Sequence, residues 1–354
     1  MSRFLNEKVQ RLEPYTPGEQ PKERKYIKLN TNESPFPPSK EAVKRANEQA
    51  EKLLLYPDPD CKELLQAIAD EYGVQPSEVI VTNGSDEVLN FAFMAYCDES
   101  TPALFPDITY GFYKVFAAVN GVPYEEIPLT DDFKISVKDY MDQIGVIFIA
   151  NPNAPTGIAL DVSKIEKLLK DNPDRIVVVD EAYVDFGGES CVPLIHKYDN
   201  LLVTQTFSKS RSMAGARLGF GIASEEIISD LMRVKYSTNP YNVNRMTAAA
   251  GLGAILDHEY FSGNCQKIIE NRKYLRKELK SLGFKMTDSS ANFLFVKHNR
   301  IGGEELYNKL KERGILVRHF NSERIEEYNR ITIGSMEEMQ ALVETVKSIL
   351  GEKK

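Results

Sequence analysis

The feature that most constrains this chain is a series of short, uniformly apolar segments between residues 78 and 240. The segments VIVT, PALF, GVIFIA, RIVVVD, LLVTQTF and LGFGIA alternate with amphipathic stretches of helical periodicity. A strand that is apolar on both faces must be covered on both faces, as it is in a parallel sheet flanked by helices. The pattern therefore predicts an α/β fold with a large, mostly parallel-sheet domain over residues 31–240.

The N-terminal part of the chain has a different pattern. Residues 1–30 are rich in Pro, Glu and Lys and contain the turn-forming stretch EPYTPGEQPKER, which predicts an arm rather than a packed unit. Helical patterns follow over residues 39–52 and 62–72, separated by the helix-breaking sequence YPDPD.

Residues 241–354 predict a connecting helical region followed by a smaller α+β domain. The helical pattern covers residues 242–282 and is expected to be interrupted near residues 260–264. The order strand, helix, strand, strand, helix follows. Ser335 and Glu338 have the spacing of a capping box, which predicts the start of the last helix.

The charge and apolar pattern exclude several classes of function. The 354 residues carry 44 Lys and Arg against 52 Asp and Glu, a net charge of -8. Such a surface repels nucleic acid and acidic membranes, so neither is expected as a partner. No stretch approaches the roughly 18 apolar residues that span a bilayer, and the first residues lack the apolar core of a signal peptide. We therefore expect a cytoplasmic protein without a membrane segment.

The cysteines and histidines do not form a metal-binding or disulfide pattern. Neither CxxC nor HExxH occurs. We interpret the cysteines as reduced packing residues, and we expect no catalytic metal. The residues concerned are Cys61, Cys97, Cys191, Cys265, His196, His258, His298 and His319.

Lys209, in the motif TFSKS, is the first candidate for chemistry. It follows the predicted strand LLVTQTF, and ligands of open α/β sheets bind outside the carboxyl ends of the strands. The position suits a catalytic lysine. Taken alone the motif is weak, because most of the 44 Lys and Arg residues must be solvated surface charges.

Asp180 and Tyr183, in VVVDEAY, are the second candidates. Asp180 ends a strand that is expected to be buried, and a buried carboxylate needs a cationic or hydrogen-bonding partner. A pyridinium nitrogen would serve, because a carboxylate keeps it protonated and able to withdraw electrons. The structural alternative is an aspartate that caps the next helix.

The sequence VTNGSDEVL predicts a strand that ends at Gly84 and a helix that begins near Ser85 and Asp86. Free N–H groups at a helix start, approached closely because Gly84 has no side chain, form an anion site. Arg217 adds a guanidinium suited to bidentate contact with phosphate. Separately, a Gly-Ser turn is usually only a cap, and such an arginine is usually an ordinary ion-pair partner.

The sequence NPNAPTG, residues 151–157, again directly follows a predicted strand. Its prolines and glycine predict a rigid turn. Such a turn can be a simple connection, or it can aim a polar group at a ligand.

Together, these motifs resemble the fold-type I pyridoxal-phosphate aminotransferases, in the histidinol-phosphate aminotransferase branch. The resemblance covers essentially the whole chain, and its order and spacing are far more specific than any single motif. The motifs are LNTNESPFPP, YPDP, TNGSDE, the TYG around Tyr110, NPNAPTG, DEAY, TFSKS with Arg217, VRHF and RITIG.

The resemblance implies a role for each candidate. Lys209 holds the cofactor, pyridoxal 5'-phosphate, as a Schiff base and later moves the proton. Asp180 pairs with the ring nitrogen, Tyr183 with the phenolic oxygen, and Tyr110 stacks on the ring. Tyr56, from YPDP, reaches the phosphate from a second subunit, which implies a homodimer. The phosphate ligands within the chain are Gly84, Ser85, Asp86, Thr206, Ser208 and Arg217.

For the substrate, the resemblance implies that Arg330 in RITIG binds an anion, with Arg318 in VRHF, Tyr15 and Asn32 as further candidates. One anion site serves both half-reactions, because a guanidinium suits the carboxylate of glutamate as well as a phosphate ester. The structural alternative for Arg330 is an ion pair at a strand edge.

The chain departs from the family at Ala154. The family usually has Asn before Pro-Thr-Gly, where its amide bonds the phenolic oxygen of the cofactor. We expect Asn153 to supply the missing donor. One neutral hydrogen bond contributes about 0.5–1.5 kcal/mol, too little to abolish activity when it is lost.

The expected function is transfer of an amino group between L-histidinol phosphate and 2-oxoglutarate. Three alternatives remain open at this point. The chain also resembles threonine-phosphate decarboxylases, which share the fold and cofactor and act on phosphorylated substrates. An aromatic amino acid aminotransferase and a non-catalytic protein that binds pyridoxal phosphate are the other two.

Overall fold

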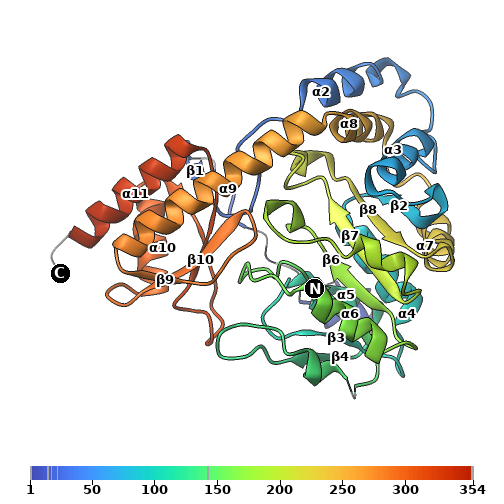
Figure 1. Cartoon of the computed structure of the whole chain (residues 1–354), viewed down its shortest axis with the longest axis horizontal. Coiled ribbons are helices and arrows are strands. Elements are labelled where there is room, and N and C mark those ends of the chain that lie inside the picture. Colours follow the sequence, from blue (N-terminus) through green and yellow to red (C-terminus); the bar gives the residue numbers. More distant parts are fainter. Residues whose placement is uncertain (1, 14–15, 17, 22, 142, 352–354) are drawn as a thin grey trace.

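The computed structural model describes residues 2–13, 16, 18–21, 23–141 and 143–351. Within them, a seven-stranded sheet has the order β2-β8-β7-β6-β5-β3-β4 (Figure 1). Strands β3 to β7 run parallel to one another, and β8 pairs antiparallel with both β7 and β2. The strands are β2 (Val79–Thr82), β3 (Ala103–Pro106), β4 (Tyr124–Ile127), β5 (Val146–Ala150), β6 (Val177–Asp180), β7 (Leu201–Thr206) and β8 (Gly219–Ala223).

This sheet confirms the predicted mostly parallel architecture, and its core shows why the strands are uniformly apolar. Val177 and Val179 pack in one cluster with Leu168, whereas Val178, between them, packs on the other face with Leu89. Both faces are therefore covered. Strand β4 was not predicted, because it lies at the sheet edge and its residues YEEI are largely exposed.

Helices cover both faces of this sheet. They are α3 (Lys62–Tyr72), α4 (Ser85–Tyr96), α5 (Phe112–Asn120), α6 (Val162–Asp171), α7 (Glu225–Thr238) and α8 (Arg245–Leu256). Helix α2 (Lys40–Asn47) packs on α8. The 3-10 turns are η1 (Ala50–Lys52), η2 (Pro76–Glu78), η3 (Val137–Tyr140), η4 (Val184–Phe186), η5 (Val192–His196) and η6 (Ala214–Ala216). The predicted helix over 39–52 is thus α2 followed by η1.

The C-terminal part forms the predicted smaller α+β unit, with a four-stranded sheet of order β12-β13-β10-β9. Figure 1 shows α9 running from beside α8 to this sheet, with α11 packed along it. The elements are α9 (His258–Ser281), β9 (Phe284–Met286), β10 (Phe293–His298), α10 (Gly303–Glu312), β11 (Ile315–Leu316), β12 (Arg318–His319), β13 (Asn329–Thr332) and α11 (Met336–Gly351).

Two details of this part tested sequence expectations. The capping box of α11 is confirmed: Ser335 N donates to Glu338 Oε2 at 2.8 Å and Glu338 N to Ser335 Oγ at 3.3 Å. The interruption expected near residues 260–264 was misplaced. The helices divide at Asp257, whose carboxylate caps α9 by accepting from Tyr260 N at 3.4 Å.

The N-terminal segment contains α1 (Glu7–Gln10) and then joins the smaller unit through β1 (Ile27–Lys28), which pairs parallel with β11. These two strands form a separate two-stranded sheet, so the chain passes through the smaller unit before it reaches α2. The domain boundaries 1–30, 31–240 and 241–354 stay a prediction. Across the described residues, no helix is both long and apolar enough to cross a membrane.

Candidate active site

Two adjoining cavities lie at the carboxyl ends of β5, β6 and β7. The Asp180 cavity has a volume of about 270 Å³, and the Arg330 cavity about 420 Å³. Both are lined by Thr31, Tyr110, Ala154, Tyr183 and Lys209, so these residues form their common wall. The Asp180 cavity is also lined by the predicted residues Ser85, Asp86, Asp180, Thr206, Ser208 and Arg217.

Lys209 lies on the wall between the cavities, three residues after β7 ends. Its Nζ donates to the carbonyl oxygen of Thr31 at 3.1 Å. Burial, followed by the positive charge of Arg330, lowers the pKa of Lys209 to about 8. The neutral amine, the form that acts as nucleophile and as base, is therefore far more populated near neutral pH than in an ordinary lysine.

Asp180 ends β6 and is only 6% exposed. Its carboxylate accepts from the hydroxyl of Tyr113 at 3.3 Å and from Ala182 N at 3.2 Å. Burial raises the pKa of Asp180 to about 7. Two neutral donors thus leave the ionised carboxylate poorly stabilised. A cationic ring nitrogen in the cavity would supply a positive charge next to it.

The start of α4 forms a cradle for an anion. Gly84 is the N-cap at φ 81°, with no side-chain cap for the first N–H groups. The positive φ favours glycine at this position, and a Cβ atom there would lie 2.8 Å from Arg217 Nη2. Arg217 donates to Asp86 Oδ2 at 3.1 Å and to Ser208 Oγ at 3.2 Å. These donors fit a phosphate group.

Arg217 itself adopts a left-handed backbone conformation, with φ 55°. A non-glycine residue there costs on the order of 1–2 kcal/mol. Tyr110 completes the arrangement, because its hydroxyl donates to Asp86 Oδ1 at 2.8 Å. The backbone strain at Arg217 therefore lies at a position where the side chain directs its guanidinium into the cavity.

The structure does not bring Asn153 to the cavities, which corrects the expectation that its amide compensates for Ala154. Asn153 is 2% exposed, and its Nδ2 donates to Ile108 O at 2.9 Å and to Thr156 Oγ1 at 3.0 Å. Its Oδ1 accepts from Thr109. The amide is thus engaged by the turn and by the connection after β3, and Ala154 presents only a methyl group to both cavities.

Arg330 and Arg318 lie opposite each other on the paired strands β13 and β12, and both line the Arg330 cavity. Arg330 Nη2 donates to Asn30 O at 3.0 Å. Asn32, also on this wall, donates from Nδ2 to the hydroxyl of Tyr183 at 3.0 Å. The cavity therefore has two guanidinium groups on one side, which suits an anionic substrate.

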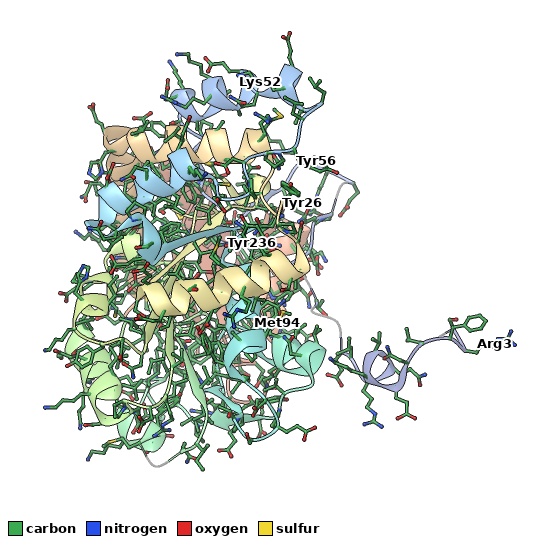
Figure 2. The ribbon with its side chains drawn as sticks, turned by 90° about the vertical axis from the view of Figure 1, so that its right-hand side faces the viewer. Arg3, Tyr26, Lys52, Tyr56, Met94 and Tyr236 are labelled. Carbon is green, nitrogen blue, oxygen red and sulfur yellow. The ribbon has the colours of Figure 1, made fainter. Side chains whose placement is uncertain are left out.

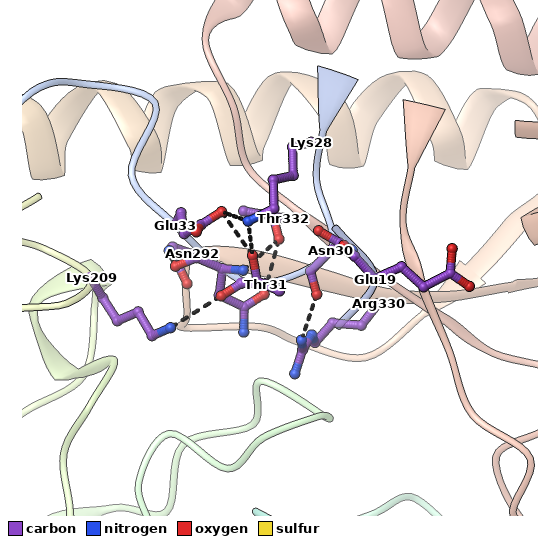
Figure 3. Close-up of polar contacts among 10 residues, drawn as sticks. Glu19, Lys28, Asn30, Thr31, Glu33, Lys209, Asn292, Arg330 and Thr332 are labelled. Atoms are coloured by element: carbon purple, nitrogen blue, oxygen red, sulfur yellow. Dashed lines mark hydrogen bonds and ion pairs between the residues drawn. The ribbon is translucent and has the colours of Figure 1, made fainter. Parts of the chain in front are cut away.

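The backbone carbonyls of residues 30, 31 and 32 each accept a hydrogen bond from a distant part of the chain. Figure 3 shows those of Asn30 and Thr31. Arg330 donates to Asn30, Lys209 to Thr31 and, at 3.0 Å, Asn292 Nδ2 to Asn32. The segment thus orients the Lys209 amine on the common wall and the guanidinium of Arg330 in the Arg330 cavity.

Two predicted residues lie elsewhere. Tyr56 is 78% exposed and outside both cavities, with its ring stacked on Tyr241 at a centroid distance of 4.7 Å. Tyr15 lies outside the described residues. Thr31, Glu33 and Tyr113 were missed; for Tyr113 the signal was its position three residues after Tyr110. Within the described residues, no group of His, Cys, Asp and Glu suits a metal ion.

Comparison with known proteins agrees with this geometry. Residues 24–346 match the family of class I and II aminotransferases. The fold and the site therefore define a pyridoxal-phosphate-dependent aminotransferase of this class.

Relatives identify the branch. The histidinol-phosphate aminotransferase of Brachyspira hyodysenteriae is 49% identical over 354 residues and 99% of both chains. That of Clostridium acetobutylicum is 47% identical over 351 residues, 99% of this chain and all of the relative. The chain belongs to the histidinol-phosphate aminotransferase family.

Solved structures confirm the fold. The histidinol-phosphate aminotransferase of Sinorhizobium meliloti, in complex with pyridoxal-5'-phosphate, has a TM-score of 0.89 at 20% identity over 99% of both chains. The L-threonine-O-3-phosphate decarboxylase of Porphyromonas gingivalis has a TM-score of 0.80 at 22% identity, over 92% of this chain and 100% of that one. At such identities the likeness concerns the fold alone.

Proposed function

We propose that this protein transfers the amino group of L-histidinol phosphate to 2-oxoglutarate. The observation that carries the proposal is a lysine of lowered pKa placed between two cationic sites, Arg217 in one cavity and Arg330 in the other. One site suits the phosphate of a cofactor, and the other suits an anionic substrate. The family membership supplies the substrate class.

Pyridoxal phosphate fits the Asp180 cavity. Its phosphate would be held by the first N–H groups of α4 and by Thr206, Ser208 and Arg217. Asp180 would hold its ring nitrogen, Tyr183 would donate to its phenolic oxygen, and Tyr110 would stack on the ring. When bound, this cofactor supplies an aldehyde that condenses with amines and a ring that withdraws electrons from the substrate Cα.

The chain supplies the proton transfer and the orientation. Lys209 would remove the proton from the substrate Cα through its neutral Nζ and would give it back later in the transfer. Asp180 would keep a positive charge on the ring nitrogen of the cofactor, which would stabilise negative charge at the substrate Cα. With Ala154 next to it, Tyr183 is the donor we assign to the phenolic oxygen, and Asn32 orients its hydroxyl.

Arg330 would bind the substrate anion in both half-reactions, with Arg318 beside it on β12. A phosphate ester and the distal carboxylate of 2-oxoglutarate both accept paired N–H donors, so one guanidinium serves each in turn. This requires the two substrates to occupy the cavity alternately rather than together.

We further propose a cytoplasmic homodimer in which Tyr56 reaches the cofactor phosphate of the second subunit. Leu53, Leu54, Leu55 and Tyr56 are all exposed, and Figure 2 views the face on which Tyr56, Met94 and Tyr236 lie. A contiguous exposed apolar group of this kind is typical of an interface. We propose that a second copy of the chain covers this exposed apolar group.

The function is tested with a screen of amino donors against 2-oxoglutarate. We expect L-histidinol phosphate to give the highest kcat/KM and to form glutamate in equal amount. Preference for an aromatic amino acid would contradict the proposed donor. Release of carbon dioxide from a phosphorylated amino acid, without any 2-oxo acid, would instead identify a decarboxylase.

Arg330→Gln is expected to raise the KM for L-histidinol phosphate by about 100-fold, because one partner of a buried charged contact contributes roughly 2–5 kcal/mol. The dissociation constant of pyridoxal phosphate should change little, because Arg330 does not line the Asp180 cavity. Steady-state kinetics and cofactor titration measure the two effects. Arg300→Gln, in the loop after β10, is the matched control. An unchanged KM would remove Arg330 from the substrate site.

A further inference from the structure

The turn that carries Tyr56 is held by two cations from different helices. Arg245, at the start of α8, donates from Nη2 to the carbonyl oxygen of Tyr56 at 2.9 Å. Lys235, in the last turn of α7, donates from Nζ to the carbonyl oxygen of Pro59 at 2.6 Å. The two contacts fix the two ends of residues 56–59.

The ammonium group of Lys235 is buried at a cost in free energy. Its side chain is only 1% exposed, and burial lowers its pKa. In the described part of the chain, the carboxylates of Asp58, Asp60 and Glu87 act on the ammonium only at a distance, and its hydrogen bond goes to a backbone carbonyl. A buried ammonium without a paired carboxylate is costly, and an apolar side chain would pack there at lower cost. The presence of a lysine at this buried position therefore indicates that the hydrogen bond to the backbone of the turn at residues 56–59 has a role of its own.

Further contacts restrict the turn, while most of the Tyr56 side chain stays exposed to a partner. The Tyr56 ring stacks on Tyr241 at 4.7 Å, and the hydroxyl of Tyr236 donates to Asp60 Oδ1 at 2.6 Å. Cys61 has a left-handed backbone at φ 52°, and Asp58 Oδ2 accepts from Lys62 N at 3.0 Å. A rigid backbone thus presents a side chain that remains 78% exposed.

We propose that Lys235 and Arg245 are positioning residues that aim Tyr56 at the cofactor phosphate of a second copy of this chain. The inference rests on the proposed dimer and on the proposed role of Tyr56 across its interface. A side chain that must enter another subunit binds more tightly when its conformation is set beforehand, because less conformational freedom is lost on contact.

Hybrid dimers of two differently tagged full-length chains test the inference. One chain carries Lys209→Ala, so only the other chain has an intact site, and the Tyr56 that serves it belongs to the Lys209→Ala chain. Adding Lys235→Met to the Lys209→Ala chain should raise the dissociation constant of pyridoxal phosphate at the intact site by about tenfold, as expected for loss of one charged hydrogen bond. Adding Lys235→Met to the other chain should leave it within about twofold. Titration of the cofactor-free hybrids, followed by borohydride fixation, counts the intact sites.

The controls separate the inference from its basis. Tyr56→Phe is placed in the same two arrangements. Arg233→Met, on the exposed side of α7, is the matched charge control. Arg245→Met replaces Lys235→Met if the latter does not fold.

If Tyr56→Phe has a trans effect but neither Lys235→Met nor Arg245→Met has one, the positioning role alone is overturned. No trans effect of Tyr56→Phe overturns the subunit-crossing role and the inference with it. Equal effects of Lys235→Met in both arrangements indicate a merely structural residue and also overturn it.

Discussion

Lys209→Ala is expected to lower kcat for transamination by at least about 10⁴-fold. The substitution removes both the amine that attaches the cofactor and the base that moves the proton at Cα, and a positioned base alone contributes 10²–10⁴-fold. Single-turnover measurements, with the cofactor saturating, isolate this loss from any change in cofactor affinity. Borohydride should leave the cofactor attached to the wild-type chain and removable from the variant.

The fold should survive this substitution. Among the described residues, Lys209 Nζ donates one hydrogen bond, to the Thr31 carbonyl oxygen, and burial disfavours its charged form. Removing the side chain therefore removes a partly desolvated charge. Lys277→Ala, on α9, controls for the loss of a lysine elsewhere. Retained turnover in Lys209→Ala, with an unchanged melting temperature, would contradict the assignment of Lys209 and with it the mechanism.

Asp180→Asn is expected to lower kcat by about 10²–10³-fold, the size of losing one preorganised electrostatic contact to a developing charge. Asparagine keeps the size of the side chain but cannot hold a protonated ring nitrogen as an ion pair. Glu181→Gln is the matched control, since Glu181 is equally buried but is held by Ser190, Cys191 and Gln205 away from the cavity. A similar loss in both variants would show that the effect is structural.

The same variant should stabilise the cofactor-free protein at neutral pH. Folding raises the pKa of Asp180 from 3.8 to about 7, so the folded state binds the proton more tightly than the unfolded state. Its contribution to stability is then lost as the pH rises through this range, and above pH 7 the ionised carboxylate is destabilising. Asp180→Asn should be more stable by roughly 2–4 kcal/mol above pH 7 and equal to wild type near pH 3.

Denaturant unfolding of the cofactor-free proteins at several pH values measures this difference. Addition of pyridoxal phosphate should reverse the order, because the ring nitrogen stabilises the carboxylate and has no such partner in the variant. A wild-type protein whose stability relative to the variant does not change between pH 4 and 7 would show that Asp180 has no perturbed pKa.

Residues at the ends of strands were predictable because the strand pattern itself places them. Asp180, Lys209 and the Gly84 turn each follow a segment that is apolar on both faces, and parallel strands bring their carboxyl ends to one edge. Asn153 also follows a buried strand, and yet its amide does not line either cavity. The direction of an amide in a tight turn depends on Thr109 and Ile108, which belong to another connection.

The apolar periodicity alone determined the mostly parallel sheet, its covering helices and the location of the site, because burial on both faces leaves few other arrangements. Only the tertiary structure decided how the two cavities are joined. The carbonyls of Asn30, Thr31 and Asn32 meet donors 300, 178 and 260 residues away. Every residue has a carbonyl group, so no side-chain pattern in the segment 30–32 marks which distant amine, guanidinium or amide each one will accept.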